Sequence, residues 1–195
     1  MKRTTAILLL FFLFHLPLKH PAAAELTIIT EEFPPLNYTE NGKLTGAMTD
    51  VVQEITRRLG IANDIQVLPW ARGYKRLLTE PNIVLFTTAR TEARESLFHW
   101  VGPLHSARIG LYARKSDQRQ IDSIEAAMQV DAIATYKDDV REQILESLGF
   151  TNIDSSNSPL SNIRKLVSGR VDLWIFDNVG AQQVAREAGI DPQEI

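Results

Sequence analysis

The 195-residue chain contains no cysteine, which excludes a disulfide framework, a thiolate metal site and a cysteine nucleophile. Histidine is scarce too, and only His99 and His105 follow residue 24. Each stands apart from other metal-binding side chains, so we predict no metal site and no histidine-based catalytic pair. The chain also lacks a G-x-S-x-G nucleophile motif and a glycine-rich phosphate loop. We therefore predict neither an enzyme nor a bound cofactor.

The first 24 residues have the pattern of a secretion signal. Lys2 and Arg3 precede an apolar run at 6–16, and Ala22-Ala23-Ala24 forms an A-x-A cleavage site. The alternative is an uncleaved membrane anchor, but the run is shorter than the roughly 20 residues that cross a bilayer. We predict that residues 1–24 are removed and that the mature protein is periplasmic.

Removing this leader changes the charge of the protein. The leader holds Lys2, Arg3 and Lys19 and no acidic residue, so its loss lowers the net charge from −3 to −6. An acidic surface argues against nucleic acid as a partner. The remaining chain is long enough for one large or two small domains, and we expect a monomer.

Short apolar runs alternate with amphipathic segments along the mature chain, which predicts an α/β fold with mostly parallel sheets. The predicted strands cover residues 26–30, 65–68, 83–87, 108–113, 131–134, the neighbourhood of Ile153, and 171–176. The predicted helices cover 49–59, 121–128, 138–148, 158–168 and 178–188, and a further short helix begins at Trp70. The helix at 49–59 carries Val51, Val52, Ile55 and Leu59 on one face, and Asn41-Gly42 marks a tight turn. A polar break at 114–117 predicts two lobes, at 25–113 and 114–195.

The stretch 70–103 carries the clearest chemical pattern. Its apolar run at 83–86 is typical of a strand buried on both faces, and Arg94 follows in a helical turn that begins at Thr91. Hydroxyls, free backbone N–H groups and a guanidinium beyond the carboxyl end of a buried strand form a receptor for a small anionic group. The residues that supply the hydroxyls and the N–H groups are Thr87, Thr88 and Ala89.

This stretch resembles the family 3 solute-binding proteins, the periplasmic receptors of polar amino-acid ABC importers. The matching residues are the T-x-x-R motif from Thr91 to Arg94 and the phenylalanine at Phe98. Upstream, residues 26–60 resemble the family's opening strand, aromatic-proline loop, glycine turn and first helix. Downstream, the sequence SGRVDLWIFD at 168–177 is similar to the family's G-x-x-D-x-x-x-x-D element. The resemblance implies a periplasmic-binding-protein-like two-lobe fold of type II.

The same resemblance implies that the chain ends early. In the family, the polypeptide returns from the second lobe to complete the first, whereas this sequence ends at Ile195 in what looks like the preceding loop. We therefore expect a truncated C-terminus and a first lobe with an unprotected sheet edge.

The resemblance assigns a ligand carboxylate to Arg94, assisted by Thr87, and a ligand ammonium to Asp177. A guanidinium binds a carboxylate through two parallel hydrogen bonds, and a carboxylate suits an ammonium. Two alternatives remain open. Arg94 could be a surface residue paired with Glu92 or Glu95, and Asp177 could cap the following helix.

Several further residues are predicted to line the cleft. Phe33 lies in the rigid loop after the first strand, and Trp70 and Arg72 lie at the start of the second helix. Ordinary core packing is the alternative for both aromatic residues. Tyr136 stands in the stretch 135–139, where amino-acid-binding members of the family usually have small residues; it narrows the cleft and argues against an ordinary α-amino acid. We expect the aspartates of this stretch to cap the following helix.

The leading hypothesis is an exported receptor that captures a small polar solute, an amino acid or related carboxylate, between two lobes. Its partner would be the membrane permease of an ABC importer. An enzyme on the same scaffold, dehydratase-like or lyase-like, is the first alternative and requires a cleft carboxylate with a raised pKa. A periplasmic ligand sensor is the second.

Overall fold

The structure is a computed structural model that describes residues 26–61 and 64–195, so the predicted leader and its cleavage site lie outside it. Its strands are β1 (Thr27–Thr30), β2 (Tyr38–Glu40), β3 (Lys43–Thr45), β4 (Ile65–Val67), β5 (Ile83–Leu85), β6 (Ile109–Ala113), β7 (Ile133–Tyr136), β8 (Ile153–Ser156) and β9 (Leu173–Asp177). Its α-helices are α1 (Ala47–Leu59), α2 (Trp70–Thr79), α3 (Ile124–Met128), α4 (Val140–Ser147), α5 (Pro159–Val167) and α6 (Ala181–Glu187). Two 3-10 helices, η1 (Glu92–Leu97) and η2 (Pro192–Glu194), complete the described elements.

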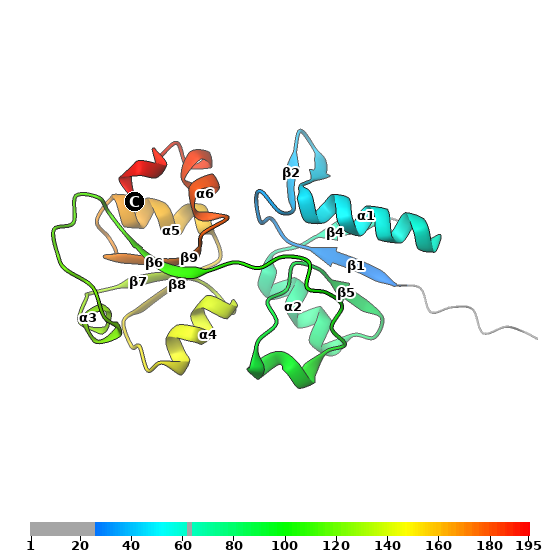
Figure 1. Ribbon diagram of the computed structural model, residues 1–195, viewed down its shortest axis with the longest axis horizontal. Helices are drawn as coiled ribbons and strands as arrows, with labels where there is room; N and C mark the ends of the chain where they lie inside the picture. The colour runs from blue at the N-terminus through cyan, green and yellow to red at the C-terminus, as the bar shows by residue number, and fades with distance from the viewer. Residues whose placement is uncertain (1–25, 62–63) are drawn as a thin grey trace, which may run out of the picture.

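The first lobe is built on a parallel sheet of order β4-β1-β5, with helices α1 and α2 on opposite faces (Figure 1). Helix α2 packs closely on β1 because Gly73 has no side chain; a Cβ there would lie 3.3 Å from Ile29 Cγ2. The β2–β3 hairpin turns at Asn41 and Gly42, whose φ angles of 51° and 76° suit the predicted tight turn. The core of this lobe is small and centres on Ile28, with Val52 and Phe86 against it.

The second lobe is built on a sheet of order β6-β9-β7-β8. Strand β6 runs antiparallel to β9, whereas β7, β8 and β9 are parallel to one another. Helices α5 and α6 cover one face and α3 and α4 the other (Figure 1). Strand β9 is buried on both sides: Trp174 and Phe176 point into the core under α5 and α6, and Leu173 and Ile175 into the core on the opposite face. The apolar run predicted from 171 to 176 therefore forms a central strand.

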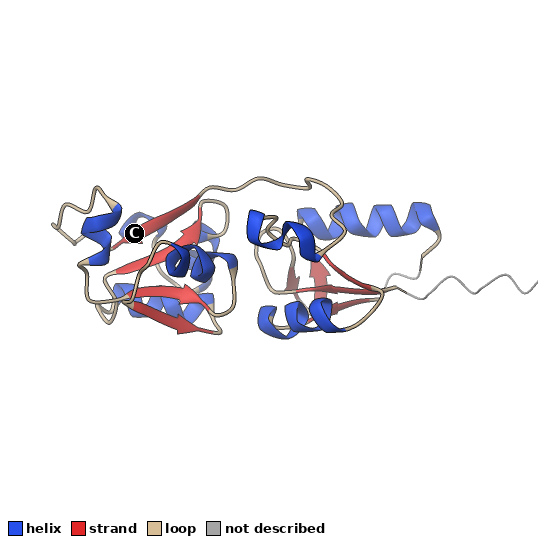
Figure 2. Ribbon diagram, turned by 90° about the horizontal axis from the view of Figure 1, so that it is seen from below, coloured by secondary structure: helices blue, strands red, loops and turns tan. Residues whose placement is uncertain are grey.

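The chain passes from one lobe to the other earlier than the sequence predicts. Strand β6 pairs with β9 along its whole length, from Ile109 opposite Asp177 to Ala113 opposite Leu173. Residues 109–113 therefore belong to the second sheet, and the boundary predicted between residues 113 and 114 is wrong. The crossing lies between Leu97 and Arg108, in the segment that joins the lobes in Figure 2.

Two predicted apolar surfaces are more exposed than expected. In helix α1 Val52 is buried, but Val51 and Ile55 are exposed and Leu59 is 67% exposed. In β5 the side chain of Val84 is exposed, so this strand is not covered on both faces as predicted. Both elements belong to the smaller core, which has too few apolar partners to cover every side of them.

Candidate functional site

The carboxyl ends of strands from both lobes meet at one interface. Glu31 follows β1 in the first lobe, and Tyr136 and Asp177 end β7 and β9 in the second. Hydrogen bonds cross this interface: Trp70 Nε1 donates to Asp138 O at 2.8 Å, and Arg94 Nε donates to Gln143 Oε1 at 3.2 Å. Among the residues predicted from the sequence, Trp70, Arg94, Tyr136 and Asp177 therefore lie around the junction of the lobes.

The side chain of Arg94, in the first lobe, is almost completely buried, and only 1% of the residue's surface is exposed. Its guanidinium carbon lies 5.3 Å from the Trp70 ring centre and 4.8 Å from that of Tyr74. Burial lowers the pKa of Arg94, while Tyr74 and Asp139 oppose that effect. The alternative of a surface pair is wrong, because it is Arg90, not Arg94, that pairs with Glu95.

Two polar atoms of the turn that carries Arg94 are buried without a hydrogen-bond partner among the described residues. They are Arg94 Nη2 and Thr91 Oγ1. Arg94 Nη1 by contrast donates to Ala89 O at 3.4 Å. A buried N–H that lacks an acceptor costs about 1–3 kcal/mol. An anionic acceptor at Nη2 would remove that penalty and form a charge-assisted hydrogen bond.

The turn after β5 is held by hydrogen bonds of its own. Thr87 Oγ1 donates to Asn37 Oδ1 at 2.6 Å, and Thr88 Oγ1 donates to Leu85 O at 3.0 Å. Both hydroxyl protons are therefore used within the lobe. Thr87 also has a φ of 62°, which is unfavourable for a β-branched residue. Such strain is concentrated at functional sites, and Ala89, two residues later, accepts the hydrogen bond from Arg94.

The aromatic residues join the two lobes. Phe33, from the loop after β1, packs against the core of the second lobe, with its ring centre 6.1 Å from that of Phe176 at an angle of 62°. Core packing and a place in the interface are thus both true of Phe33. Trp70 is buried and stacks on Tyr74 with ring centres 5.1 Å apart. Arg72 is exposed on α2, outside this group of buried contacts.

Asp177 is engaged within its own lobe. Its Oδ1 accepts hydrogen bonds from the N–H groups of Val179 and Gly180, at 3.1 Å and 2.8 Å, in the turn before α6. Its Oδ2 accepts from Arg141 Nη1 at 3.2 Å. Asp177 therefore caps the turn that precedes α6, close to the helix-capping alternative. The structure shows no direct contact between Asp177 and Arg94.

Arg141, from the first turn of α4, is the main residue that the sequence reasoning missed. It pairs with Asp139, the predicted cap of α4, as well as with Asp177. Its guanidinium carbon lies 4.2 Å from the centre of the Phe176 ring. Burial lowers the pKa of Arg141, but the charges of Asp139 and Asp177 outweigh that effect and raise it overall.

Glu31 is the second missed residue, although its position directly after a buried strand is the same signal that identified Asp177. It is 6% exposed, and Oε2 has no hydrogen-bond partner among the described residues. Burial, assisted by the charge of Asp139, raises the pKa of Glu31 to about 8, while Arg141 and a hydrogen bond with Tyr136 oppose the rise. Burial and the charge of Glu31 likewise raise the pKa of Tyr136. Near neutral pH the Glu31 carboxyl is therefore protonated and can donate a hydrogen bond.

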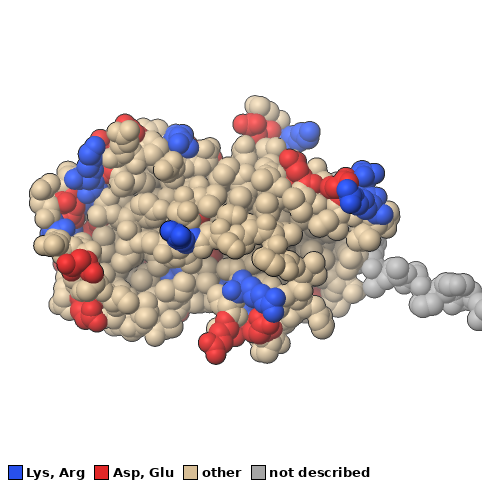
Figure 3. All heavy atoms as spheres, viewed as in Figure 1, with Lys and Arg blue, Asp and Glu red and all other residues tan. Residues whose placement is uncertain are grey.

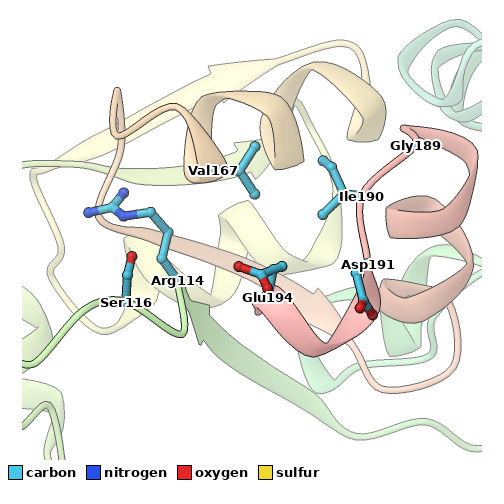
Figure 4. Close-up of a pocket in the computed structure, with 7 residues that line it drawn as sticks. All are labelled: Arg114, Ser116, Val167, Gly189, Ile190, Asp191 and Glu194. Atoms are coloured by element: carbon cyan, nitrogen blue, oxygen red, sulfur yellow. The ribbon is translucent and has the colours of Figure 1, made fainter.

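Other surfaces of the described residues carry less chemistry. No cluster of three His, Asp or Glu side chains suited to a metal ion is found in them, and none of their helices has the length and apolar character needed to cross a bilayer. Basic and acidic atoms are interspersed over the face seen in Figure 3. The pocket in Figure 4, about 310 Å³, lies in the second lobe and includes none of the interface residues; it is lined by Arg114, Ser116, Val167, Gly189, Ile190, Asp191 and Glu194.

Comparison with known proteins identifies a family and a fold. Residues 26–157 match the family described as bacterial extracellular solute-binding proteins, family 3. No protein of curated function matches the sequence. Among solved structures, the chain is similar to holo ArgBP from T. maritima, with a TM-score of 0.72, 20% identity, and coverage of 85% of this chain and 74% of that one.

Two other solved structures share this architecture. A histidine kinase sensor domain with similarity to periplasmic binding proteins has a TM-score of 0.77 at 17% identity, covering 87% of this chain and 74% of that one. The ancestral amino acid-binding protein AncCDT-1, a precursor of cyclohexadienyl dehydratase, has a TM-score of 0.70 at 20% identity, covering 83% and 75%. At these identities the likeness establishes the two-lobe fold alone.

Proposed function

The chain belongs to the bacterial extracellular solute-binding proteins, family 3, and we propose that it is an exported receptor for a small polar solute that carries a carboxylate. The solute would bind where the two lobes meet and pass to the membrane permease of an ABC importer. The observation that carries this proposal is the buried guanidinium of Arg94, whose Nη2 has no acceptor among the described residues. The periplasmic location, the cleaved leader and the monomeric state form part of the same proposal.

The energetics favour binding of a carboxylate at the buried Arg94 over binding at a surface arginine. An ion pair in water is worth under about 1 kcal/mol. In the interface the guanidinium is instead desolvated against Trp70 and Tyr74, where a charge-assisted hydrogen bond contributes about 1.5–3 kcal/mol. A carboxylate at Nη2 would therefore gain more from this position than from one at the surface.

Binding and lobe closure would be coupled. Arg94 and Trp70 of the first lobe both hydrogen-bond to the second lobe, at Gln143 and at the carbonyl of Asp138. These bonds form only when the lobes are together. The crossing between Leu97 and Arg108 would act as a hinge between a first lobe ending near residue 97 and a second beginning near residue 109.

A thermal-shift screen of amino acids and small carboxylates tests the proposal, followed by calorimetry on wild type and Arg94→Lys. A ligand at 100 times its Kd adds about 2.7 kcal/mol of stability. We expect Arg94→Lys to weaken binding by about 100-fold, because a lysine ammonium does not reproduce the planar guanidinium, which hydrogen-bonds to Gln143 and Ala89 and leaves Nη2 for the ligand. Arg90→Lys, at an exposed arginine four residues away, is the matched control and should bind normally. Equal affinities of wild type and Arg94→Lys would contradict the proposal.

One observation favours the enzyme alternative, namely the buried Glu31 carboxyl with a pKa of about 8. A carboxyl that is protonated at neutral pH can act as a general acid toward a bound ligand. Any ligand from the screen should therefore be incubated with wild type and Glu31→Gln and examined by mass spectrometry. Conversion by wild type and not by Glu31→Gln would establish an enzyme, whereas unchanged ligand would leave the receptor.

A further inference from the structure

Arg141 occupies the interface between the lobes in the manner of a bound cation. It is 5% exposed, although it lies in the first turn of a surface helix. Its guanidinium carbon lies 4.2 Å from the Phe176 ring centre, 5.7 Å from that of Phe33 and 5.9 Å from that of Tyr136. Phe33 belongs to the first lobe, so aromatic rings from both lobes surround this guanidinium.

Arg141 also engages the acidic groups of the interface. Asp139 Oδ1 accepts from both the backbone N–H and Nε of Arg141, and Asp177 Oδ2 accepts from Nη1. The remaining oxygen of Asp177 is used by the turn before α6. Glu31, a further buried acid, is acted on by the charges of Arg141, Asp139 and Asp177.

These contacts matter for the ligand because an ammonium group needs a carboxylate partner when it leaves water. Arg94 and Arg141 lie in one electrostatic neighbourhood, since the charge of Asp139 acts on both and Gln143, two residues after Arg141, contacts Arg94. An α-ammonium placed beside a carboxylate at Arg94 would meet a second cation, two aspartates that are already paired with Arg141, and a Glu31 carboxyl that burial keeps protonated near neutral pH. Like charges brought together in a desolvated interface repel each other strongly.

We propose that Arg141 is a built-in substitute for the ammonium group of a ligand, so that the interface selects carboxylates that lack an α-amino group. The inference rests on the proposed capture of a carboxylate at Arg94 and adds the chemical class of that carboxylate. Arg141 is a specificity-determining residue in this scheme. It holds the acidic side of the site while leaving the Nη2 of Arg94 for the ligand.

The first experiment compares acids that differ only in the α-amino group, measured with the wild-type protein by thermal shift and calorimetry. The pairs are succinate and L-aspartate, glutarate and L-glutamate, 3-phenylpropionate and L-phenylalanine, and 5-guanidinopentanoate and L-arginine. We expect the deaminated member of at least one pair to bind about 100-fold more tightly than its amino acid. An amino acid that binds as well as its deaminated partner would overturn the inference and leave the proposed receptor function standing.

The second experiment tests, without any carboxylate ligand, whether the position of the Arg141 guanidinium is a cation-binding site. Arg141→Ala removes the guanidinium and opens space between Phe33, Tyr136 and Phe176. We expect n-propylguanidinium at 10 mM to raise the Tm of Arg141→Ala by about 2 °C or more. Wild type and Arg170→Ala, which changes an exposed arginine of the same lobe, should not respond, and n-propylammonium should act weakly on all three.

The two experiments decide the matter together. If no acid of the panel binds wild type, the receptor proposal fails on this panel, and rescue by n-propylguanidinium still decides whether Arg141 fills a cation site. An Arg141→Ala protein that ignores n-propylguanidinium would overturn the inference. Where Arg141→Ala does not fold, Arg141→Gln replaces it, and calorimetry should show that its preference for deaminated acids falls about tenfold or more relative to wild type. An unchanged preference would show Arg141 to be a structural residue only.

Discussion

Replacing Glu31 by glutamine should change how the stability of the protein depends on pH. The pKa of this buried carboxyl is raised from 4.5 to about 8, mainly because burial disfavours its charged form. At about 1.4 kcal/mol for each pKa unit, ionising Glu31 in the folded protein removes on the order of 5 kcal/mol of stability. The folded state holds its proton more tightly than the unfolded state, so the stabilisation is complete below pH 4.5 and is lost as the pH rises toward 8.

The assay is urea unfolding of wild type and Glu31→Gln at pH values from 5 to 9, followed by tryptophan fluorescence. The glutamine cannot ionise, so its advantage over wild type should grow by about 1.4 kcal/mol per pH unit between pH 5 and pH 8 and then level off. Glu146→Gln, which alters an exposed carboxyl of the second lobe, should parallel wild type. Parallel curves for wild type and Glu31→Gln would refute the argument, because they would show that Glu31 titrates alike in the folded and unfolded states.

Two further substitutions test the interface itself. Gly180→Ala would place a Cβ 2.8 Å from Phe176 Cε1, so we expect a loss of about 1–3 kcal/mol in the free energy of unfolding in urea; Gly110→Ala, where nothing lies within 4 Å of the new Cβ, should lose much less. Trp70→Phe removes the hydrogen bond to Asp138 O and should weaken ligand binding by about 1 kcal/mol in calorimetry; an unchanged Kd would show that this bond does not contribute to closure.

The predictable part of the fold depends on local patterns. Ser158 caps α5 and directly precedes Pro159, the first residue of that helix. Gly60 ends α1 in the left-handed conformation with a φ of 65°. The strand at 109–113 is also predictable, but its partner is not. An apolar strand near a lobe boundary carries no local signal of which sheet it joins, and its pairing with β9 depends on a segment at least 60 residues away.

The candidate site shows the same division. Arg94 and Trp70 stand out because each follows a recognisable turn after a short apolar run in the sequence. Arg141 does not, because an arginine in the first turn of a helix, between Asp139 and Glu142, has the pattern of a solvated charge. Its burial depends on aromatic rings from β9 and from the loop after β1, which meet only in the folded protein.

The reach of Phe33 into the second lobe has a consequence for temperature. When the lobes separate, the rings of Phe33 and Phe176 exchange contact with each other for contact with water, and exposure of apolar surface carries a positive heat capacity change. The apolar contribution to closure therefore weakens on cooling. A cold solution should hold more molecules in the open form than a warm one, and ligand affinities measured over a range of temperatures should follow a curved van 't Hoff plot.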